Sequence, residues 1–287
     1  MAAQISTVAI VGAGTMGQGI AAICAVSGFE VILFDISRDV LQQAELHIIG
    51  DLARLVEKGK LSAEGKASAL SRISYQSDIQ NLKADLVIEA VVEDLAIKQN
   101  LFRDLEACNS ADTILVSNTS SLSITQIAKE LRHPHRFAGL HFFNPAYVMK
   151  LVEIVDGPST DSAVVGQLRG FCKSLGKQAV LVKDSPGFIV NRVARLYYVE
   201  ALKIAEEGVA DFETIDKLMR GAGFRMGPFE LMDLIGIDTN FAVTQSIYHA
   251  FNEAPKFRPS QIQQQKVEAG ELGRKTGRGF YDYTAEK

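Results

Sequence analysis

A glycine-rich turn near the N-terminus constrains the fold of this chain more than any other feature. Residues 12–17 read Gly-Ala-Gly-Thr-Met-Gly and match the pattern G-x-G-x-x-G. The turn follows the short β-branched run 5–11, and Asp35 ends the next apolar run, 23 residues after Gly12. A strand, a glycine turn, a helix and a second strand in this order are typical of the first half of a dinucleotide-binding sheet.

Each glycine of this turn has its own reason to lack a side chain. Gly12 permits the tight turn, Gly14 lets a pyrophosphate approach the backbone, and Gly17 lets the helix pack closely on the strand. Thr15 and Met16 open the helix, whose free N–H groups and positive dipole end attract phosphate. These five residues therefore form the expected NAD-binding turn. The alternative is a glycine turn with a structural role only.

Asp35 indicates which dinucleotide binds. A carboxylate at the end of the second strand accepts hydrogen bonds from the adenosine ribose and repels a 2′-phosphate, so NAD is favoured over NADP. Arg38 weakens this preference slightly. The alternative is that Asp35 only caps the helix that follows it.

The rest of the pattern predicts an α/β domain followed by a helical one. Apolar strand segments alternate with helices, which favours a Rossmann-type, doubly wound and mostly parallel sheet. The amphipathic segment after Ser37 and a second helical segment at 63–72 predict an inserted helical pair. Beyond Pro186 only helical periodicity is present, so we expect an NAD-binding domain at 1–186 and a smaller all-α domain at 187–287. The expected strands are 5–11, 31–34, 86–88, 114–116, 137–140, 151–155 and 179–182.

Charge and composition exclude several classes of function. The 287 residues include 30 basic and 34 acidic side chains, and a formal charge of −4 has the wrong sign for a nucleic-acid-binding protein. The three cysteines, Cys24, Cys108 and Cys172, lie far apart without a ligand pattern, so we expect no disulfide, no metal and a reducing, cytoplasmic location. The first 29 residues are uncharged, but they lack the basic start of a signal peptide and are interrupted by glycines, which argues against a membrane role.

Glu153 interrupts the apolar run 151–155, which is otherwise typical of a strand buried on both faces. A buried carboxylate needs a partner, and His141, at the end of the preceding strand, is the best candidate. An imidazole held by a carboxylate would serve as a general base. Alternatively, Glu153 pairs with a surface cation such as Lys150 and His141 is a core histidine; the residues alone leave both possibilities open.

Two further polar segments lie where a substrate would bind. The segment 117–121 (Ser-Asn-Thr-Ser-Ser) leaves the end of a strand, and Asn191 lies in the first turn of the helix after Pro186. Both have a structural alternative, because polar residues at these positions often cap the next helix.

Three phrases together resemble the 3-hydroxyacyl-CoA dehydrogenase family. They are SNTSSLSI at 117–124, HFFNPAYVMKLVEIV at 141–155 and DSPGFIVNR at 184–192. The likeness covers essentially the whole chain, including GRKTGRGFYDY near its end. It implies NAD as the cofactor, an acyl-CoA substrate and a homodimer formed through the helical C-terminal domain.

The resemblance also implies catalytic roles. The histidine of the HFFNP phrase is the family's base, which corresponds to His141, and the glutamate of KLVE, which orients it, corresponds to Glu153. Ser120 and Asn191 match residues that contact the substrate and hold the reacting centre.

On the cofactor side, the resemblance points to Glu93, Lys98 and Asn118. It also gives the basic end of the inserted helices a role in contacting the phosphates of coenzyme A, for which Arg54 and Lys58 are the candidates. The alternative for these two cations is a solvated helix face.

The implied reaction is NAD-dependent oxidation of (S)-3-hydroxyacyl-CoA to 3-ketoacyl-CoA, and its reverse. The length of this protein resembles that of family members that act on short acyl groups, so 3-hydroxybutyryl-CoA is the expected substrate. Two other functions stay open: a dehydrogenase of a free hydroxy or sugar acid on the same scaffold, and a catalytically silent NAD-binding protein.

Overall fold

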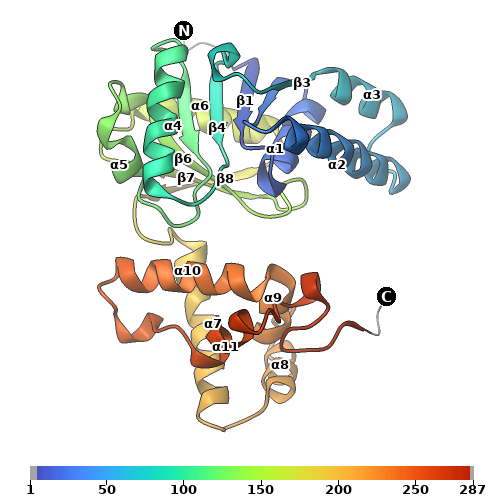
Figure 1. Ribbon diagram of the computed structural model, residues 1–287, viewed down its shortest axis with the longest axis vertical. Helices are drawn as coiled ribbons and strands as arrows, with labels where there is room; N and C mark the ends of the chain where they lie inside the picture. Colours follow the sequence, from blue (N-terminus) through green and yellow to red (C-terminus); the bar gives the residue numbers. More distant parts are fainter. Residues whose placement is uncertain (1–4, 285–287) are drawn as a thin grey trace. The chain divides into compact units, whose positions relative to one another are not determined.

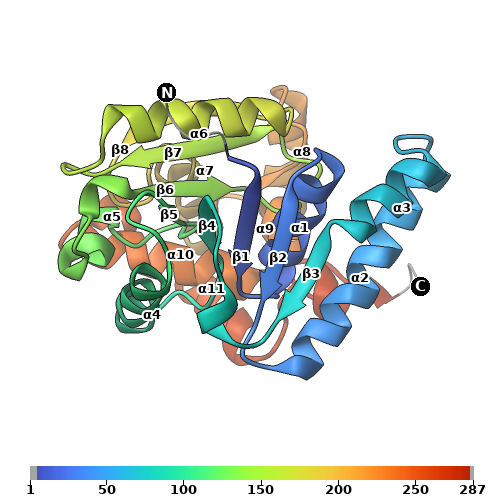
Figure 2. The ribbon, with the colours of Figure 1, turned by 90° about the horizontal axis from the view of Figure 1, so that it is seen from above.

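Eight strands in the described part of the chain form a single sheet (Figure 2). They are β1 (Thr7–Val11), β2 (Glu30–Phe34), β3 (Ile73–Gln76), β4 (Leu86–Glu89), β5 (Ile114–Ser117), β6 (Phe137–Phe142), β7 (Leu151–Asp156) and β8 (Gln178–Lys183). Their order across the sheet is β3-β2-β1-β4-β5-β6-β7-β8. Because the order reverses between β1 and β4, the carboxyl ends of these strands form the edge where a doubly wound sheet binds its ligand.

The computed structural model describes residues 5–284. The chain divides into two compact units, Met1–Ser185 and Pro186–Lys287, called here the N-terminal and C-terminal units. Residues 1–4 and 285–287, the outer ends of the two predicted domains, lie outside the described residues. No helix among residues 5–284 combines the length and the apolar character needed to cross a membrane.

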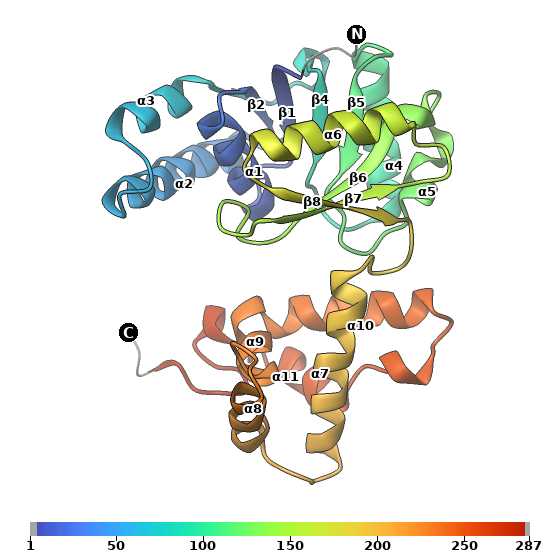
Figure 3. The ribbon, with the colours of Figure 1, turned by 180° about the vertical axis from the view of Figure 1, so that it is seen from behind.

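Helices cover both faces of the sheet (Figures 1 and 3). Helix α4 (Leu95–Cys108) lies on one face, while α1 (Thr15–Val26) and α6 (Ser162–Ser174) lie on the opposite face. The ring of Phe102 on α4 meets Phe137 edge-on at 4.7 Å between ring centroids. On the other face Phe29, which follows α1, meets Phe171 of α6 at 5.2 Å. These aromatic contacts fix the helices against the sheet.

The predicted inserted pair is present as α2 (Arg38–Glu57) and α3 (Ala63–Ser71). Ser37 caps α2 as expected, since its hydroxyl accepts a hydrogen bond from the backbone N–H of Val40. The buried face of α2 joins the sheet core through Leu41, Ala44, Ile48 and Leu52. The short helix α5 (Ile124–Ile127) follows β5, and 3₁₀ turns occur at Ile79–Asn81, Ala128–Glu130, Pro134–Arg136, Pro255–Phe257 and Arg274–Thr276.

Two features of the sheet differ from the sequence-based expectation. Strand β3 was not expected, because its four residues contain one large aliphatic side chain and so give a weak strand pattern. Strand β7 pairs antiparallel with β6, because the connection 143–150 contains no crossover helix and the chain returns directly. The other neighbouring strands pair in parallel, so the predicted mostly parallel sheet is confirmed.

The C-terminal unit contains helices and no named strand among its described residues. The helices are α7 (Val190–Glu206), α8 (Phe212–Gly221), α9 (Pro228–Ile235), α10 (Ile237–Ala250) and α11 (Gln261–Glu268). The predicted change from an α/β to an all-α architecture is therefore confirmed.

Two buried aspartates of the C-terminal unit hold the final segment 279–283. Asp233 on α9 accepts hydrogen bonds from the backbone N–H groups of Phe280 and Tyr281, and Asp216 on α8 accepts one from the Tyr281 hydroxyl. Burial raises the pKa of both carboxyls above the ordinary value. The GRGFYDY phrase thus has a structural explanation, because it packs on the helices through these two side chains.

Candidate active site

The glycine turn has the three-part geometry that the sequence predicts. Gly12 has φ +104°, and a Cβ there would lie 2.6 Å from the carbonyl oxygen of Ala90. A Cβ at Gly17 would lie 1.8 Å from the carbonyl oxygen of Gly12, so the helix could not approach the strand. Gly14 is different, because it is exposed and a Cβ there would meet no atom within 4 Å. The space above Gly14 is therefore open toward the start of α1.

The first turn of α1 presents donors that no side chain caps. Gly14 is the N-cap residue of α1, and Thr15 and Met16 are the first two residues of the helix. Uncapped N–H groups at a helix N-terminus form an anion site, and the dipole of the helix adds to the attraction. The residues of this turn thus fit the diphosphate group of a dinucleotide.

The Asp35 carboxylate lies at the end of β2 and fixes this turn. Its Oδ2 accepts a hydrogen bond from the N–H of Ala13 at 3.0 Å, and its Oδ1 accepts one from the N–H of Ser37 at 3.0 Å. Asp35 therefore connects the glycine turn to the start of α2, and its negative charge lies beside the predicted phosphate site.

His141 and Glu153 form a buried pair. They are direct cross-strand partners in the antiparallel pair β6–β7, so both side chains lie on the same face of the sheet. The Nδ1 atom of His141 lies 2.8 Å from Oε2 of Glu153, and the two residues are 5% and 1% exposed. Of the two alternatives left open by the residues, the structure contains the histidine–glutamate pair. The Phe143 ring lies against the imidazole, with 4.4 Å between ring centroids.

Asn118 connects the ends of β5 and β6. Its Oδ1 accepts a hydrogen bond from the backbone N–H of Phe142 at 2.8 Å, and its own N–H donates to the carbonyl of Glu89 at 2.8 Å. The residue next to His141 is thereby tied to the start of the segment 118–121. The polar segment predicted from the sequence and the His141 strand are therefore neighbours at one edge of the sheet.

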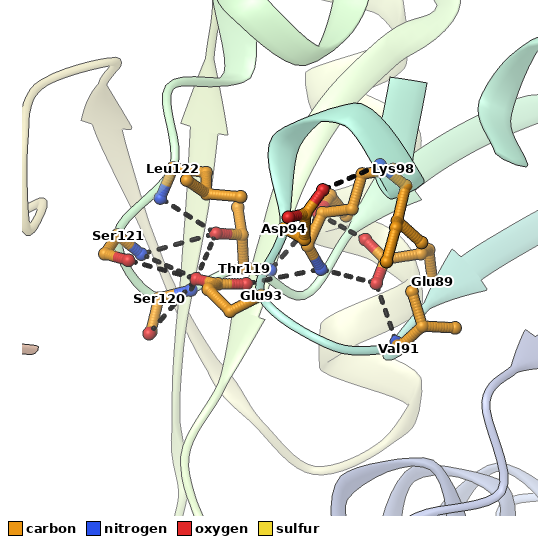
Figure 4. A network of polar contacts seen from close by, with 11 residues as sticks. Glu89, Val91, Glu93, Asp94, Lys98, Thr119, Ser120, Ser121 and Leu122 are labelled. Carbon is orange, nitrogen blue, oxygen red and sulfur yellow. Dashed lines mark hydrogen bonds and ion pairs between the residues drawn. The ribbon is translucent and has the colours of Figure 1, made fainter. Parts of the chain in front are cut away.

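Glu93 organises the turn that contains Ser120 (Figure 4). Its Oε1 accepts hydrogen bonds from the Thr119 hydroxyl at 2.6 Å, the Ser120 N–H at 3.0 Å, and the N–H and hydroxyl of Ser121 at 3.2 and 3.1 Å. The Ser120 hydroxyl donates to the same oxygen at 3.4 Å, the longest of these hydrogen bonds. Burial alone would raise the pKa of Glu93, but Lys98 and these hydrogen bonds outweigh it and leave the pKa below its ordinary value.

Lys98 lies between two carboxylates. Its Nζ is 2.5 Å from Oε1 of Glu89 and 3.3 Å from Oε2 of Glu93, and the residue is 1% exposed. Lys98 is therefore a buried cation that two carboxylates share. Sequence reasoning found Lys98 and Glu93 but missed Glu89, although a charged residue at the end of the apolar run 86–88 was the available signal.

Asp184 is a second residue that sequence reasoning did not single out. It lies in the phrase at 184–192, and its Oδ2 accepts hydrogen bonds from the Ser123 hydroxyl at 2.7 Å and from the Thr125 N–H and hydroxyl at 2.8 and 2.6 Å. Its Oδ1 accepts one from the Ile124 N–H. Asp184 thus fixes the end of the N-terminal unit to the start of α5. Helix α5 begins shortly after the Ser120 turn in the sequence.

Three predicted site residues remain: Arg54, Lys58 and Asn191. Arg54 in the last turn of α2 forms an ion pair with Asp51 at 2.6 Å, and Lys58 follows as the exposed C-cap residue. The structure thus places the two cations one turn apart at the end of the inserted helix. Asn191 belongs to the C-terminal unit, in the first turn of α7, and is half-buried.

Comparison with known proteins assigns both units. The family model described as 3-hydroxyacyl-CoA dehydrogenase, NAD binding domain, matches residues 7–185, and the model of the C-terminal domain of the same family matches residues 187–283. Together the two matches cover nearly all of the described chain.

Individual relatives give the same result. All of this chain aligns, at 51% identity, with a 3-hydroxyadipyl-CoA dehydrogenase of Escherichia coli, but the alignment spans only 61% of that longer protein. It is 44% identical to a 3-hydroxybutyryl-CoA dehydrogenase of Bradyrhizobium diazoefficiens, covering 100% of this chain and 98% of the relative. The crystal structure of (S)-3-hydroxybutyryl-CoA dehydrogenase from Ralstonia eutropha is 43% identical with a TM-score of 0.93, covering 98% of this chain and 100% of that one. The chain therefore belongs to the 3-hydroxyacyl-CoA dehydrogenase family and is an oxidoreductase with an NAD-binding domain.

Proposed function

We propose that this protein oxidises short-chain (S)-3-hydroxyacyl-CoA, with 3-hydroxybutyryl-CoA as the preferred substrate, and catalyses the reverse reduction. The observation that carries the proposal is the buried pair of His141 and Glu153, with His141 at the same carboxyl edge of the sheet as a glycine turn that fits a dinucleotide. The acyl-chain length rests on the names of relatives, two for 3-hydroxybutyryl-CoA and one for 3-hydroxyadipyl-CoA.

The geometry of the pair suits a general base. An ionised carboxylate only accepts hydrogen bonds, so Nδ1 of His141 carries the proton toward Glu153 and the lone pair lies on Nε2. We propose that Nε2 removes the proton from the 3-hydroxyl, and that the negative charge of Glu153 stabilises the imidazolium that forms. When bound, the nicotinamide cofactor supplies the acceptor for the hydride that leaves carbon 3.

The other candidates complete the site. We propose that the Ser120 hydroxyl and Asn191 hold the substrate oxygen at the reacting carbon, where donors stabilise developing charge. The cofactor side of the site is shaped by the segment 118–121, which is held in place by Glu93, Lys98 and Asn118. Arg54 and Lys58 contact the phosphates of coenzyme A, because a chain with a net charge of −4 must bind a polyanion through local cations.

The proposal is tested by comparing two substrates that differ only in the thioester. The purified chain is supplied with NADH and either acetoacetyl-CoA or free acetoacetate, and NADH consumption is followed by absorbance. We expect turnover of the thioester and little turnover of the free acid. Turnover of free acetoacetate alone would favour the hydroxy-acid alternative, and no turnover of any thioester would overturn the proposal.

Replacing Asp35 with serine is expected to weaken the preference for NADH over NADPH by about tenfold or more, which corresponds to about 1.4 kcal/mol. The change removes the negative charge that would repel a 2′-phosphate and leaves the exposed cation Arg38 nearby. The measurement is the ratio of kcat/KM for the two cofactors. Asp39→Ser, an equal charge change at an exposed position in the first turn of α2, is the matched control. An Asp35 variant with the same ratio as the control would contradict the ribose role.

We also propose a homodimer that forms through the C-terminal unit. Several large apolar side chains of this unit are exposed: Val193, Leu196, Val209, Leu218, Phe224, Leu234 and Ile235. Large exposed apolar side chains of this kind favour a protein–protein interface when they lie on one face, which the proposal assumes. Sedimentation equilibrium gives the mass directly, and a monomer at all concentrations would contradict the proposal.

A cytoplasmic location, expected from the three cysteines, remains part of the proposal.

A further inference from the structure

The contacts of Glu89 go beyond what is needed to pack the end of β4. Its Oε1 accepts hydrogen bonds from Lys98 at 2.5 Å and from the Val91 N–H at 2.7 Å, and its Oε2 accepts one from the Ser117 hydroxyl at 2.6 Å. The residue is fully buried. Every one of these contacts can bring a proton toward the carboxyl group, so Glu89 acts as an acceptor at both oxygens. This is the arrangement of an ionised carboxylate.

Burial opposes this charge. It raises the pKa of Glu89, and Lys98, Ser117 and Val91 each act in the opposite direction. A buried charge of this kind is retained only when it is paired and hydrogen-bonded, and Glu89 meets both conditions. A leucine or valine would fill the same position without these costs, so the carboxylate requires an explanation beyond packing.

The Lys98 ammonium group connects Glu89 to Glu93, which holds the Ser120 turn (Figure 4). It lies 2.5 Å from Glu89 and 3.3 Å from Glu93, so its closer contact is with the residue anchored on the sheet. Glu93 in turn accepts hydrogen bonds from the backbone N–H groups of Ser120 and Ser121. The contacts therefore run from the end of β4 through Lys98 and Glu93 to the backbone of Ser120.

We infer that Glu89 is a positioning residue for catalysis: it holds Lys98, and through Lys98 and Glu93 it fixes the Ser120 turn in the position that the reaction requires. The inference rests on the proposed function, in which the Ser120 hydroxyl contacts the substrate. Its structural basis is that Glu93 accepts hydrogen bonds from the backbone N–H of Ser120 at 3.0 Å and from its hydroxyl at 3.4 Å. The backbone bond fixes the turn, and the longer hydroxyl bond is the one that a substrate oxygen would replace.

Glu89→Gln removes the charge and nearly preserves the shape. The amide oxygen can still accept from Lys98 and Val91, and the amide NH₂ can donate to the Ser117 hydroxyl. Lys98 is then attracted to Glu93 alone, and Glu93 moves relative to the Ser120 turn. Because a misplacement of about 1 Å at a reacting group can cost about 100-fold, we expect kcat with acetoacetyl-CoA and NADH to fall about 10- to 100-fold. The Kd for NADH should rise by a smaller factor than kcat falls, because Glu93 and Lys98 also serve the cofactor side whereas the glycine turn and Asp35 are unchanged.

A double variant separates positioning from stability. Lys98→Met alone leaves Glu89 buried without its cation and should lower the thermal midpoint strongly. Glu89→Gln combined with Lys98→Met removes both charges, so its midpoint should lie well above that of Lys98→Met, while its kcat stays as low as that of Glu89→Gln. Should the single variants fail to fold, the double variant still tests the inference, because full activity in it would overturn the inference.

Glu106→Gln is the matched control. Glu106 lies on the same helix as Lys98 and binds backbone N–H groups of Arg132 and His133, away from this network. A kcat of Glu89→Gln within about twofold of this control would overturn the inference. An inactive wild-type chain would instead overturn the proposed function, so the two failures are distinguishable.

Discussion

Replacing His141 with alanine is expected to lower kcat for acetoacetyl-CoA reduction by about 10²- to 10⁴-fold. The side chain is the proposed proton donor and acceptor, and its contact with Glu153 at 2.8 Å fixes the imidazole in one tautomer. The glycine turn and Asp35 lie on other strands, so the Kd for NADH should stay within about threefold of the wild-type value. Steady-state kinetics and NADH fluorescence measure the two quantities.

His249→Ala is the control for this variant. His249 is exposed at the end of α10 and forms an i,i+4 contact with Glu253, so its removal should leave kcat unchanged. If the His141 variant turns over acetoacetyl-CoA at the rate of the control, His141 has no part in the mechanism. A loss of NADH binding in parallel with activity would indicate a folding defect and not a missing base.

Glu153→Gln is the second large effect, with an expected fall in kcat of about 10²- to 10⁴-fold. The glutamine amide can donate a hydrogen bond to Nδ1 of His141, which would place the proton on Nε2 and remove the lone pair that accepts the substrate proton. The variant also lacks the negative charge that stabilises the imidazolium. The measurement is kcat at saturating substrate, with the thermal midpoint measured in parallel.

Lys150→Met distinguishes the two possible partners of Glu153. Lys150 is exposed and precedes β7, and it was the alternative cation for this carboxylate in the sequence. We expect this variant to keep the wild-type kcat. Equal losses in Glu153→Gln and Lys150→Met would contradict the assignment of His141 as the functional partner.

The glycine turn was predictable from sequence because most of its requirements are local. The positive φ of Gly12 concerns that residue alone, and a Cβ at Gly17 would collide with the carbonyl of Gly12, five residues earlier. Only the contact of Gly12 with Ala90 involves a distant segment. The pattern of strand, turn and helix therefore contains most of the information. The cap at Ser37 was predictable for the same reason.

Pairings between distant residues were only partly predictable. The odd position of Glu153 in a buried strand indicated that it needs a partner, but the register of β6 and β7 decides that the partner is His141. That register depends on the antiparallel return of the chain, which the alternating pattern did not reveal. Glu89 gave a weaker signal, because it ends an apolar run whereas Glu153 lies inside one, and its partner Lys98 is nine residues away on α4.

The hydrogen on carbon 3 of the substrate can be followed directly with deuterium. (S)-3-Hydroxybutyryl-CoA carrying deuterium at carbon 3 is incubated with NAD and the wild-type chain, and the NADH formed is analysed by mass spectrometry. We expect the deuterium of carbon 3 to be transferred to NADH, and the His141→Ala variant to form at least about 100-fold less labelled NADH in the same time. Unlabelled NADH, or labelled NADH formed equally fast by the variant, would contradict it.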